Sequence, residues 1–360
     1  MRTELCKWRW VAIALLSLGT TCCGGGGDIA QGSSTLSDTN LKTVTTGITL
    51  LAGEINTPEL GLSNLRLAAT DTLGNFYVEG QKYSGGDAYT VIRKVSAQGE
   101  VTTIFPTSTS VPDFPGIVFG VTSLGELIAG CVVTPPSATP TTGFFHRFNA
   151  ICRMAPGGIA TMVPGTLGLH AYSGTVDSRG NVFALDADNL SARQFMSDGS
   201  SRTLLSMTSN LPGSGNYCSF GSMAVDPAGN AFVSNNLQIF RVGVDGVVSL
   251  LAGWAETPCY TNEFSVRVDG IGSAARFANI NSMATDTTGN LFVMDRNTIR
   301  KVTPAGVVTT VAGQPDSIGV KLGPLPGSFN SPNGLSYVPG SANQKFATID
   351  ENSVLVTTLP

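Results

Sequence analysis

The stretch Ser282–Gly313 reads SMATDTTGNLFVMDRNTIRKVTPAGVVTTVAG, and it decides the fold because another part of the chain repeats it over its full length. That second copy is Ser222–Gly253, SMAVDPAGNAFVSNNLQIFRVGVDGVVSLLAG. Self-similarity of this kind is typical of architectures in which each repeat is one supersecondary unit. Weaker copies begin at Leu67 and Gly174, and two degraded copies begin at Phe119 and Gly334. The chain therefore contains six repeats.

Each repeat predicts four short strands. In the first stretch quoted, SMATD is the first strand, and the D-T-T-G-N segment is a hairpin turn whose glycine supplies a positive φ. LFVMD and TIRKVT follow as strands, and a second glycine turn leads to the last strand, VVTTVAG. The hairpin-turn glycines of the six repeats are Gly74, Gly125, Gly180, Gly229, Gly289 and Gly340. Six four-stranded antiparallel units at this period predict an all-β, six-bladed β-propeller.

The two ends of the chain predict how the ring closes. The last repeat has no segment for its fourth strand, whereas GITLLAG at Gly47–Gly53 is similar to the fourth-strand segments GVVSLLAG and GVVTTVAG. We therefore expect residues 48–52 to form the outer strand of the last blade. This pairing would remove an open strand edge from the ring. The propeller so predicted covers residues 44–360.

The run that begins at Asp269, DGIGSAARFANINSMATDTTGNLFVMDRNTIRKVTPAGVVTTVAG, resembles an NHL repeat. The pattern of that family contains phenylalanine-x-x-proline, a D-x-x-G-N turn, a strand that ends V-x-D, and I-R-K before a glycine turn. Ile280 takes the place of the usual proline here, whereas Phe329 and Pro332 keep the pattern in the last repeat. NHL propellers include scaffolds, RNA-binding proteins and a few lyases, so the resemblance implies the fold rather than a function.

Residues 1–22 have the organisation of a lipoprotein-type signal peptide. Three basic residues precede the apolar segment Trp10–Leu18, which is too short to span a bilayer, and small residues then lead to cysteine. In bacterial lipoproteins the cysteine after the cleavage site carries the lipid, and Cys22 and Cys23 are both candidates for that modification. An ordinary signal peptide cut near Thr21, or a retained membrane anchor, would explain the same segment.

Residues 23–43 are rich in glycine, serine, threonine and aspartate without periodicity, so we expect a flexible tether. The chain has 21 basic and 25 acidic residues, and this balance argues against a nucleic-acid partner. We expect an exported monomer that is anchored by lipid in the bacterial cell envelope and faces the periplasm or the cell surface.

The repeats differ in length at two kinds of connection, the one between the second and third strands and the one between blades. In an up-and-down blade both emerge on one face of the ring, which we call the loop-bearing face, and we expect binding there. The cysteines fall on this face too, and export permits disulfides. We expect a bond between Cys131 and Cys152 across the insertion at 132–149, and a bond between Cys218 and Cys259. Free buried thiols are the alternative.

The ends of the second strands carry Asp186, Asn235 and Asp295. A ring of oxygen ligands at these positions would suit Ca²⁺, as in gluconolactonase-type propellers. The alternative is that each side chain caps the turn after its own strand. No cofactor is expected, with Ca²⁺ as the one alternative.

Aromatic residues and both histidines fall in predicted loops of the loop-bearing face. Amphipathic rings suit contacts with sugars or proteins, although loops also pack on their own aromatics. The candidate ligand-binding residues are Phe144, Phe145, His146, Phe148, His170, Tyr217, Trp254 and Tyr260.

These features together predict a non-enzymatic, lipid-anchored propeller that binds a protein or carbohydrate ligand through its loop-bearing face. No catalytic residue is assigned, because the sequence holds no G-x-S-x-G nucleophile motif and only two histidines. The alternative function is a Ca²⁺-dependent hydrolase or lactonase with the metal ion in the central cavity.

Overall fold

The computed structural model describes residues 46–53, 62–84, 87–105, 117–133, 148–155, 160–206, 220–254, 266–340 and 343–360. The chain divides into two units, Met1–Thr43 and Val44–Pro360, and all the described residues belong to the second. The only helix in these ranges is the 3-10 turn η1 (Gly272–Ala274), and none of their helices is long and apolar enough to cross a membrane.

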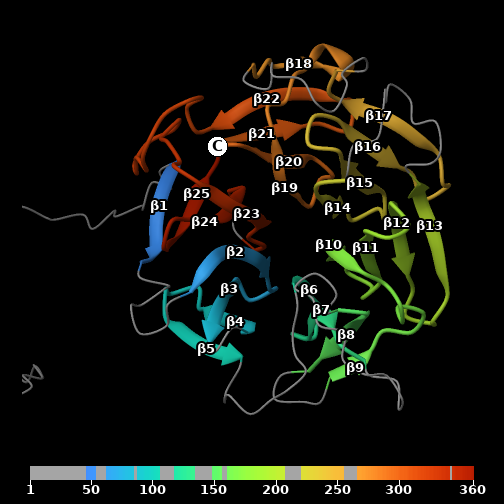
Figure 1. Ribbon diagram of the computed structural model, residues 1–360. Helices are drawn as coiled ribbons and strands as arrows, with labels where there is room; N and C mark the ends of the chain where they lie inside the picture. The colour runs from blue at the N-terminus through green and yellow to red at the C-terminus, as the bar shows by residue number, and fades with distance from the viewer. Residues whose placement is uncertain are drawn as a thin grey trace, which may run out of the picture. The chain divides into compact units, whose positions relative to one another are not determined.

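Six antiparallel sheets stand around a central axis within Val44–Pro360, and this arrangement confirms the predicted all-β, six-bladed propeller (Figure 1). Blade 1 consists of β2 (Ser63–Thr70), β3 (Phe76–Ser84), β4 (Asp87–Val95) and β5 (Val101–Phe105). Blade 2 consists of β6 (Val118–Val121), β7 (Leu127–Cys131), β8 (Ala150–Met154) and β9 (Ala160–Met162). Blade 3 consists of β10 (Ala171–Val176), β11 (Val182–Asp186), β12 (Ser191–Phe195) and β13 (Ser201–Ser206).

The second half of the ring repeats this order. Blade 4 consists of β14 (Met223–Val225), β15 (Ala231–Ser234), β16 (Ile239–Val242) and β17 (Val248–Ala252). Blade 5 consists of β19 (Ile280–Thr285), β20 (Leu291–Asp295), β21 (Thr298–Val302) and β22 (Val307–Ala312), with β18 (Gly270–Ile271) as a fifth strand. Blade 6 consists of β23 (Pro332–Tyr337), β24 (Lys345–Asp350), β25 (Ser353–Thr358) and β1 (Gly47–Ala52).

The N-terminal strand closes the ring, as predicted. β1 pairs antiparallel with β25, with Ile48 opposite Thr357 and Leu50 opposite Leu355. In Figure 1 the blue strand β1 lies beside the red strands of the same blade. Ile48 is fully buried in a cluster with Phe346 and Leu355, so apolar packing as well as backbone pairing holds the closing strand.

The D-x-x-G-N motif forms the hairpin turn between the first two strands of a blade. In blade 5 the Oδ1 atom of Asp286 accepts a hydrogen bond from the backbone N–H of Asn290 at 2.9 Å, and the Asn290 amide donates to Oδ2 at 2.8 Å. Gly289 has a φ of 82°, a conformation that suits glycine. The same two hydrogen bonds recur in the turns of blades 1, 3 and 4, so this turn is an autonomous local unit.

The hydrophobic core lies between neighbouring blades. One cluster joins Phe232 and Leu251 of blade 4 to Met283 and Leu291 of blade 5. Other clusters join blades 3 and 4, and blades 5 and 6, in the same way. Because each blade buries its two faces against its neighbours, the ring is the unit that folds rather than the single blade.

The outer edges of blades 5 and 6 are covered by connections between blades, which the sequence pattern does not predict. β18 belongs to the connection that precedes β19, and it pairs with the outer strand β22. In blade 6, Ile48 of β1 exchanges two backbone hydrogen bonds with Gly323, at 2.8 and 2.9 Å. Both contacts occupy backbone groups of an edge strand that would otherwise be open to pairing with another chain.

Candidate functional site

The strand register places the start of each inner strand beside the end of the second strand. Ala171 is opposite Asp186 in blade 3, and Ile280 is opposite Asp295 in blade 5. This end of the blades is the loop-bearing face. Much of the length variation expected at this face lies outside the described residues, in 54–61, 106–116, 134–147, 207–219 and 255–265. The described residues on either side of each range belong to this end of the strands.

The six inner strands enclose a central pocket of about 460 Å³. Most of the described side chains that line it are small or carry a neutral polar group. Ser173 and Ser282 lie on the inner strands of blades 3 and 5, and Ser222 occupies the same repeat position directly before the inner strand of blade 4. Sequence reasoning did not single them out, although the shared serine is visible in SGTVD, SMAVD and SMATD.

Arg66 is the one formally charged side chain among the described residues that line the pocket. Its Nε donates to Oε1 of Glu79 at 2.8 Å, and its Nη2 donates to the carbonyl oxygen of Val118 at 2.9 Å. The other carboxylate oxygen of Glu79 accepts the N–H of Val118 at 2.7 Å. The ion pair therefore links the inner strands of blades 1 and 2 and fixes the guanidinium. No sequence motif marks Arg66, because the other blades carry different residues at its position.

Tyr172 lines the pocket from blade 3 and acts as a hydrogen-bond donor. Its hydroxyl donates to the carbonyl oxygen of Phe220 at 2.9 Å. Burial, together with the negative charge of Asp186, raises the pKa of Tyr172 to about 12. The raised pKa keeps the hydroxyl in the protonated form that donates to Phe220.

Asp186 and Asn235 cap the turns that follow their own strands. The carboxylate of Asp186 is fully buried and accepts hydrogen bonds from the N–H of Asp188 at 3.1 Å and from the side-chain amide of Asn189 at 2.7 Å. Asn235 accepts from the N–H of Gln238 at 2.8 Å. Both residues therefore have the capping role that was the alternative to metal binding.

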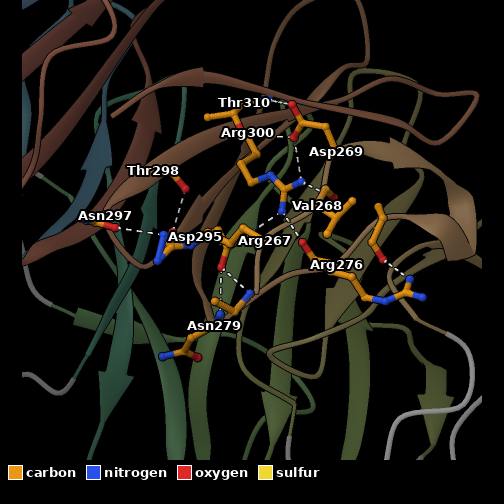
Figure 2. Close-up of polar contacts among 12 residues, drawn as sticks. Arg267, Val268, Asp269, Arg276, Asn279, Asp295, Asn297, Thr298, Arg300 and Thr310 are labelled. Atoms are coloured by element: carbon orange, nitrogen blue, oxygen red, sulfur yellow. Dashed lines mark hydrogen bonds and ion pairs between the residues drawn. The ribbon is translucent and has the colours of Figure 1, made fainter. Parts of the chain in front are cut away.

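Asp295 caps a different segment. Its Oδ1 accepts the N–H groups of Ala278 at 2.9 Å and Asn279 at 2.8 Å, which belong to the connection from blade 4 (Figure 2). Its Oδ2 pairs with the guanidinium of Arg300 at 3.1 Å. Within the described ranges, no group of three or more His, Cys, Asp or Glu side chains lies close enough to hold a metal ion. The calcium site stays a prediction.

The fully buried Arg300 fixes the connection between blades 4 and 5 to the rest of blade 5. Besides Asp295, its guanidinium donates to the carbonyl oxygens of Val268 and Arg276 and to Asp269, as Figure 2 shows. It also lies over the ring of Phe277, 4.8 Å from the ring centre. One side chain thus holds four points along residues 268–277.

The predicted disulfide between Cys131 and Cys152 is confirmed, with the two Cα atoms 5.7 Å apart. It joins β7 to β8 at the base of the insertion. Asn149 adds two hydrogen bonds to the backbone of Val133, at 2.8 and 2.9 Å. The ring of Phe148 lies against Gly130, where a Cβ atom would be only 3.2 Å from it. The base of this insertion is therefore held by one covalent bond and two side-chain hydrogen bonds.

The cysteines of blade 2 occupy the positions of the ion pair in blade 5. Cys131 is the fifth residue of β7 as Asp295 is of β20. Cys152 is opposite Ala129, the third residue of β7, as Arg300 is opposite the third residue of β20. The disulfide of blade 2 therefore occupies the same two repeat positions as the buried ion pair of blade 5.

The other predicted ligand-binding residues that the structure describes lie apart from the central pocket. The Nδ1 atom of His170 contacts the carboxylate of Asp188 at 2.5 Å. The guanidinium of Arg276 stacks over Trp254, 4.6 Å from the ring centre. The remaining predicted residues lie outside the described ranges: Cys22, Cys23, Phe144, Phe145, His146, Tyr217, Cys218, Cys259 and Tyr260.

No protein-family model matches this sequence, and no curated protein matches it. Among solved structures, a Bacteroides thetaiotaomicron protein of unknown function superposes with a TM-score of 0.61 at 18% identity, over 88% of this chain and 76% of that chain. An auxiliary nutrient binding protein from Bacteroides ovatus gives 0.59 at 17% identity, over 88% and 77%. A gluconolactonase from Xanthomonas campestris gives 0.50 at 12% identity, over 88% and 97%.

Identities this low establish likeness of fold and nothing further. The comparisons support the six-bladed propeller, and membership of the NHL family stays a prediction from the sequence.

Proposed function

We propose that the protein is a binding protein of the bacterial cell envelope, held at the membrane by lipid on Cys22 or Cys23, and that it takes a ligand at its loop-bearing face and in the central pocket. The observation that carries this proposal is the pocket itself. Its volume of about 460 Å³ lies in the range of small-molecule sites. The solved propeller from Bacteroides ovatus is named a nutrient binding protein, and the proposal places this chain in a similar class.

The contacts that hold two segments of the loop-bearing face in place also favour a binding function. The disulfide and Asn149 close the base of the insertion in blade 2, and Arg300 fixes the described part of the connection into blade 5. Segments that are already ordered lose less conformational entropy when a ligand binds. The loop-bearing face thus has two segments whose bases are held in place before a ligand binds.

The anchor is tested by replacing both Cys22 and Cys23 with serine. The double variant should leave the membrane fraction, and the two single variants should show which cysteine carries the lipid. Retention of the double variant in the membrane fraction would contradict the lipid anchor.

Binding is tested by thermal unfolding of the full-length protein in detergent with a panel of mono- and oligosaccharides. A ligand of the native state raises the melting temperature by an amount that grows with the ratio of its concentration to its Kd. The variant Ser173→Leu places a bulky side chain in the pocket and should abolish the shift. Ser197→Leu, which changes an exposed serine in a turn of the same blade, should keep it. A ligand whose effect survives Ser173→Leu would show that the pocket is not the site.

The alternative, a Ca²⁺-dependent hydrolase or lactonase, has one feature in its favour. Asp186, Asp295 and Asp350 end the second strands of blades 3, 5 and 6 at the same end of the ring. Elemental analysis of the purified protein separates the two functions. Stoichiometric calcium that survives dialysis would favour the hydrolase and count against a metal-free binding protein.

A further inference from the structure

We infer that the ligand of the central pocket is a small acidic sugar, a hydroxyl-rich molecule with one carboxylate, and that Arg66 binds the carboxylate. This inference rests on the proposed function, because it names the ligand class of the same pocket. Arg66 supplies the single formal charge of the described lining, and its partner Glu79 is not among the lining residues. A positive charge in an otherwise neutral polar pocket selects for a ligand with one negative charge.

The geometry of Arg66 leaves one end of its guanidinium for a ligand. Nε and Nη2 are bonded to Glu79 and to the Val118 carbonyl oxygen, whereas Nη1 makes no hydrogen bond to the part of the chain that the structure describes. The Arg66 side chain is 30% exposed and that of Glu79 only 11%. Both carboxylate oxygens of Glu79 are already occupied, by Arg66 and by the Val118 N–H. The guanidinium is therefore held in one orientation before a ligand arrives, as a specific site requires.

The neutral part of the lining matches sugar hydroxyls. Ser173, Ser222 and Ser282 line the pocket from one repeat position in three adjacent blades. The Ser282 hydroxyl accepts the N–H of Leu335 at 3.0 Å, which leaves its own hydrogen to donate. Asn281 adds an amide that both donates and accepts. Groups of this kind pair with the mixed donors and acceptors of a sugar ring.

The charge balance favours a carboxylate over a phosphate. A phosphate monoester carries about −1.5 to −2 charges at pH 7, which a single arginine does not neutralise. Arg66 is also paired with the negative charge of Glu79, so the net positive charge that it offers to a ligand is small. A ligand with one carboxylate matches this small positive charge better than a sugar phosphate or a nucleotide does.

The experiment compares D-galacturonate with D-galactose, which differ only in a carboxylate or a hydroxymethyl group at C6. Calorimetric titration of the full-length protein in detergent at low ionic strength should show galacturonate binding at least tenfold more tightly. Added salt should reduce the difference, because it screens the ion pair. Arg66→Gln should abolish the difference, and Arg66→Lys should keep part of it.

Arg153→Gln is the matched control. Arg153 pairs with Glu126 at 2.8 Å and is 28% exposed, close to the values for Arg66, but it is not among the lining residues. This variant should keep the preference for galacturonate. Because Arg66 also joins two blades, its loss could unfold the protein, so Ser173→Leu serves as a second variant that leaves the contacts of Arg66 intact. It should abolish binding of both sugars.

Three results would overturn the inference: equal affinity for the two sugars, a preference that Arg66→Gln leaves unchanged in a folded protein, or no binding of galacturonate to the folded native chain. None of these removes the proposed function. That function fails separately, if no saccharide of the thermal screen shifts the native protein in a manner that Ser173→Leu abolishes.

Discussion

Blades 5 and 2 each carry a long connection on the loop-bearing face, and they fasten it at the same two repeat positions by different chemistry. In blade 5 these positions hold Asp295 and Arg300, a fully buried ion pair. In blade 2 they hold Cys131 and Cys152, which are joined by a disulfide. Blade 5 keeps the repeat sequence closely, whereas blade 2 is one of its two most degraded copies.

The difference shows how a repeat can lose its sequence and keep its structure. The ion pair needs several further partners, because a buried guanidinium must have its N–H groups bonded. The two terminal nitrogens of Arg300 find them on Val268, Asp269 and Arg276 besides Asp295, whereas its Nε has no hydrogen-bond partner among the described residues. A disulfide needs no such partners and only requires the two strands to be adjacent. A blade with an altered connection can therefore use the covalent bond where the polar network would be incomplete.

The largest expected effect is that of Arg300→Met. Removal of the guanidinium leaves Asp295 buried without a cation, which typically costs about 3–5 kcal/mol. Urea unfolding should show this loss. Arg153→Met in blade 2 is the control, since its part-exposed pair with Glu126 should contribute no more than about 1 kcal/mol. Equal losses in the two variants would mean that burial does not set the value of the pair.

The second effect is loss of the disulfide in the Cys131→Ala, Cys152→Ala variant. The bond spans a sequence separation of 21 residues, and loop-closure entropy for a loop of that size predicts a loss of about 3 kcal/mol. Urea unfolding of the native chain with and without a reductant should give a similar difference. A double variant whose stability still responds to the reductant would show that a different disulfide carries the effect.

A smaller effect is expected for Asn149→Ala, which removes both hydrogen bonds to Val133 at the base of the blade 2 insertion. The loss should be about 1–2 kcal/mol in urea unfolding. Asn279→Ala in blade 5 is the matched control, because the Asn279 side chain is exposed and should be near neutral when truncated. If Asn149→Ala leaves the free energy of unfolding unchanged, the two hydrogen bonds of Asn149 do not stabilise the base of that insertion.

The smallest effect concerns Asp350, which ends the second strand of blade 6 as Asp295 ends that of blade 5. It accepts the N–H groups of Asn330 and Ser331, and burial is the main cause that raises its pKa. A raised pKa in the folded state gives stability that is present below the unfolded pKa and is lost as pH rises through the folded value. Asp350→Asn should therefore gain stability relative to the native chain as pH rises from about 3.5 to about 7.

Asp295→Asn provides the contrast for this pH experiment. This substitution removes the buried carboxylate that pairs with Arg300. The Asp295→Asn variant should therefore be less stable than the native chain across the whole pH range of the measurement. A stability difference between Asp350→Asn and the native chain that does not change with pH would contradict the raised pKa.

Much of the fold could be predicted because its signals are local. The turn motif D-x-x-G-N makes its own hydrogen bonds within five residues, so each copy specifies a hairpin wherever it stands. The closing strand could be predicted because GITLLAG is similar to other fourth strands. The pair Cys131–Cys152 could be predicted because its cysteines flank one insertion. In each of these cases the partner residue is near in the sequence or marked by a repeat.

The candidate site could be predicted only in part. Ser173, Ser222 and Ser282 share a visible repeat position, but their convergence on one pocket depends on the curvature of the ring. The strand-end residues look equivalent in the sequence, yet Asp186 caps the turn after its strand and Asp295 caps the connection before its blade. Which backbone N–H reaches the carboxylate depends on the length and path of each connection, which a repeat pattern does not encode.

The sequence by itself determined the class of fold, the number of blades, their hairpin turns and the strand that closes the ring, because the repeat pattern marks each blade and turn chemistry acts within a few residues. Only the tertiary structure decided that Arg66 would pair with Glu79 beside the pocket, that Arg300 would be buried among carbonyl oxygens, and that β18 would cover the edge of blade 5. The Arg300 and β18 contacts join blade 5 to the connection before it, and the Arg66–Glu79 pair of blade 1 also binds Val118 of blade 2. Their partners are set by the packing of the whole ring, so no local pattern marks them.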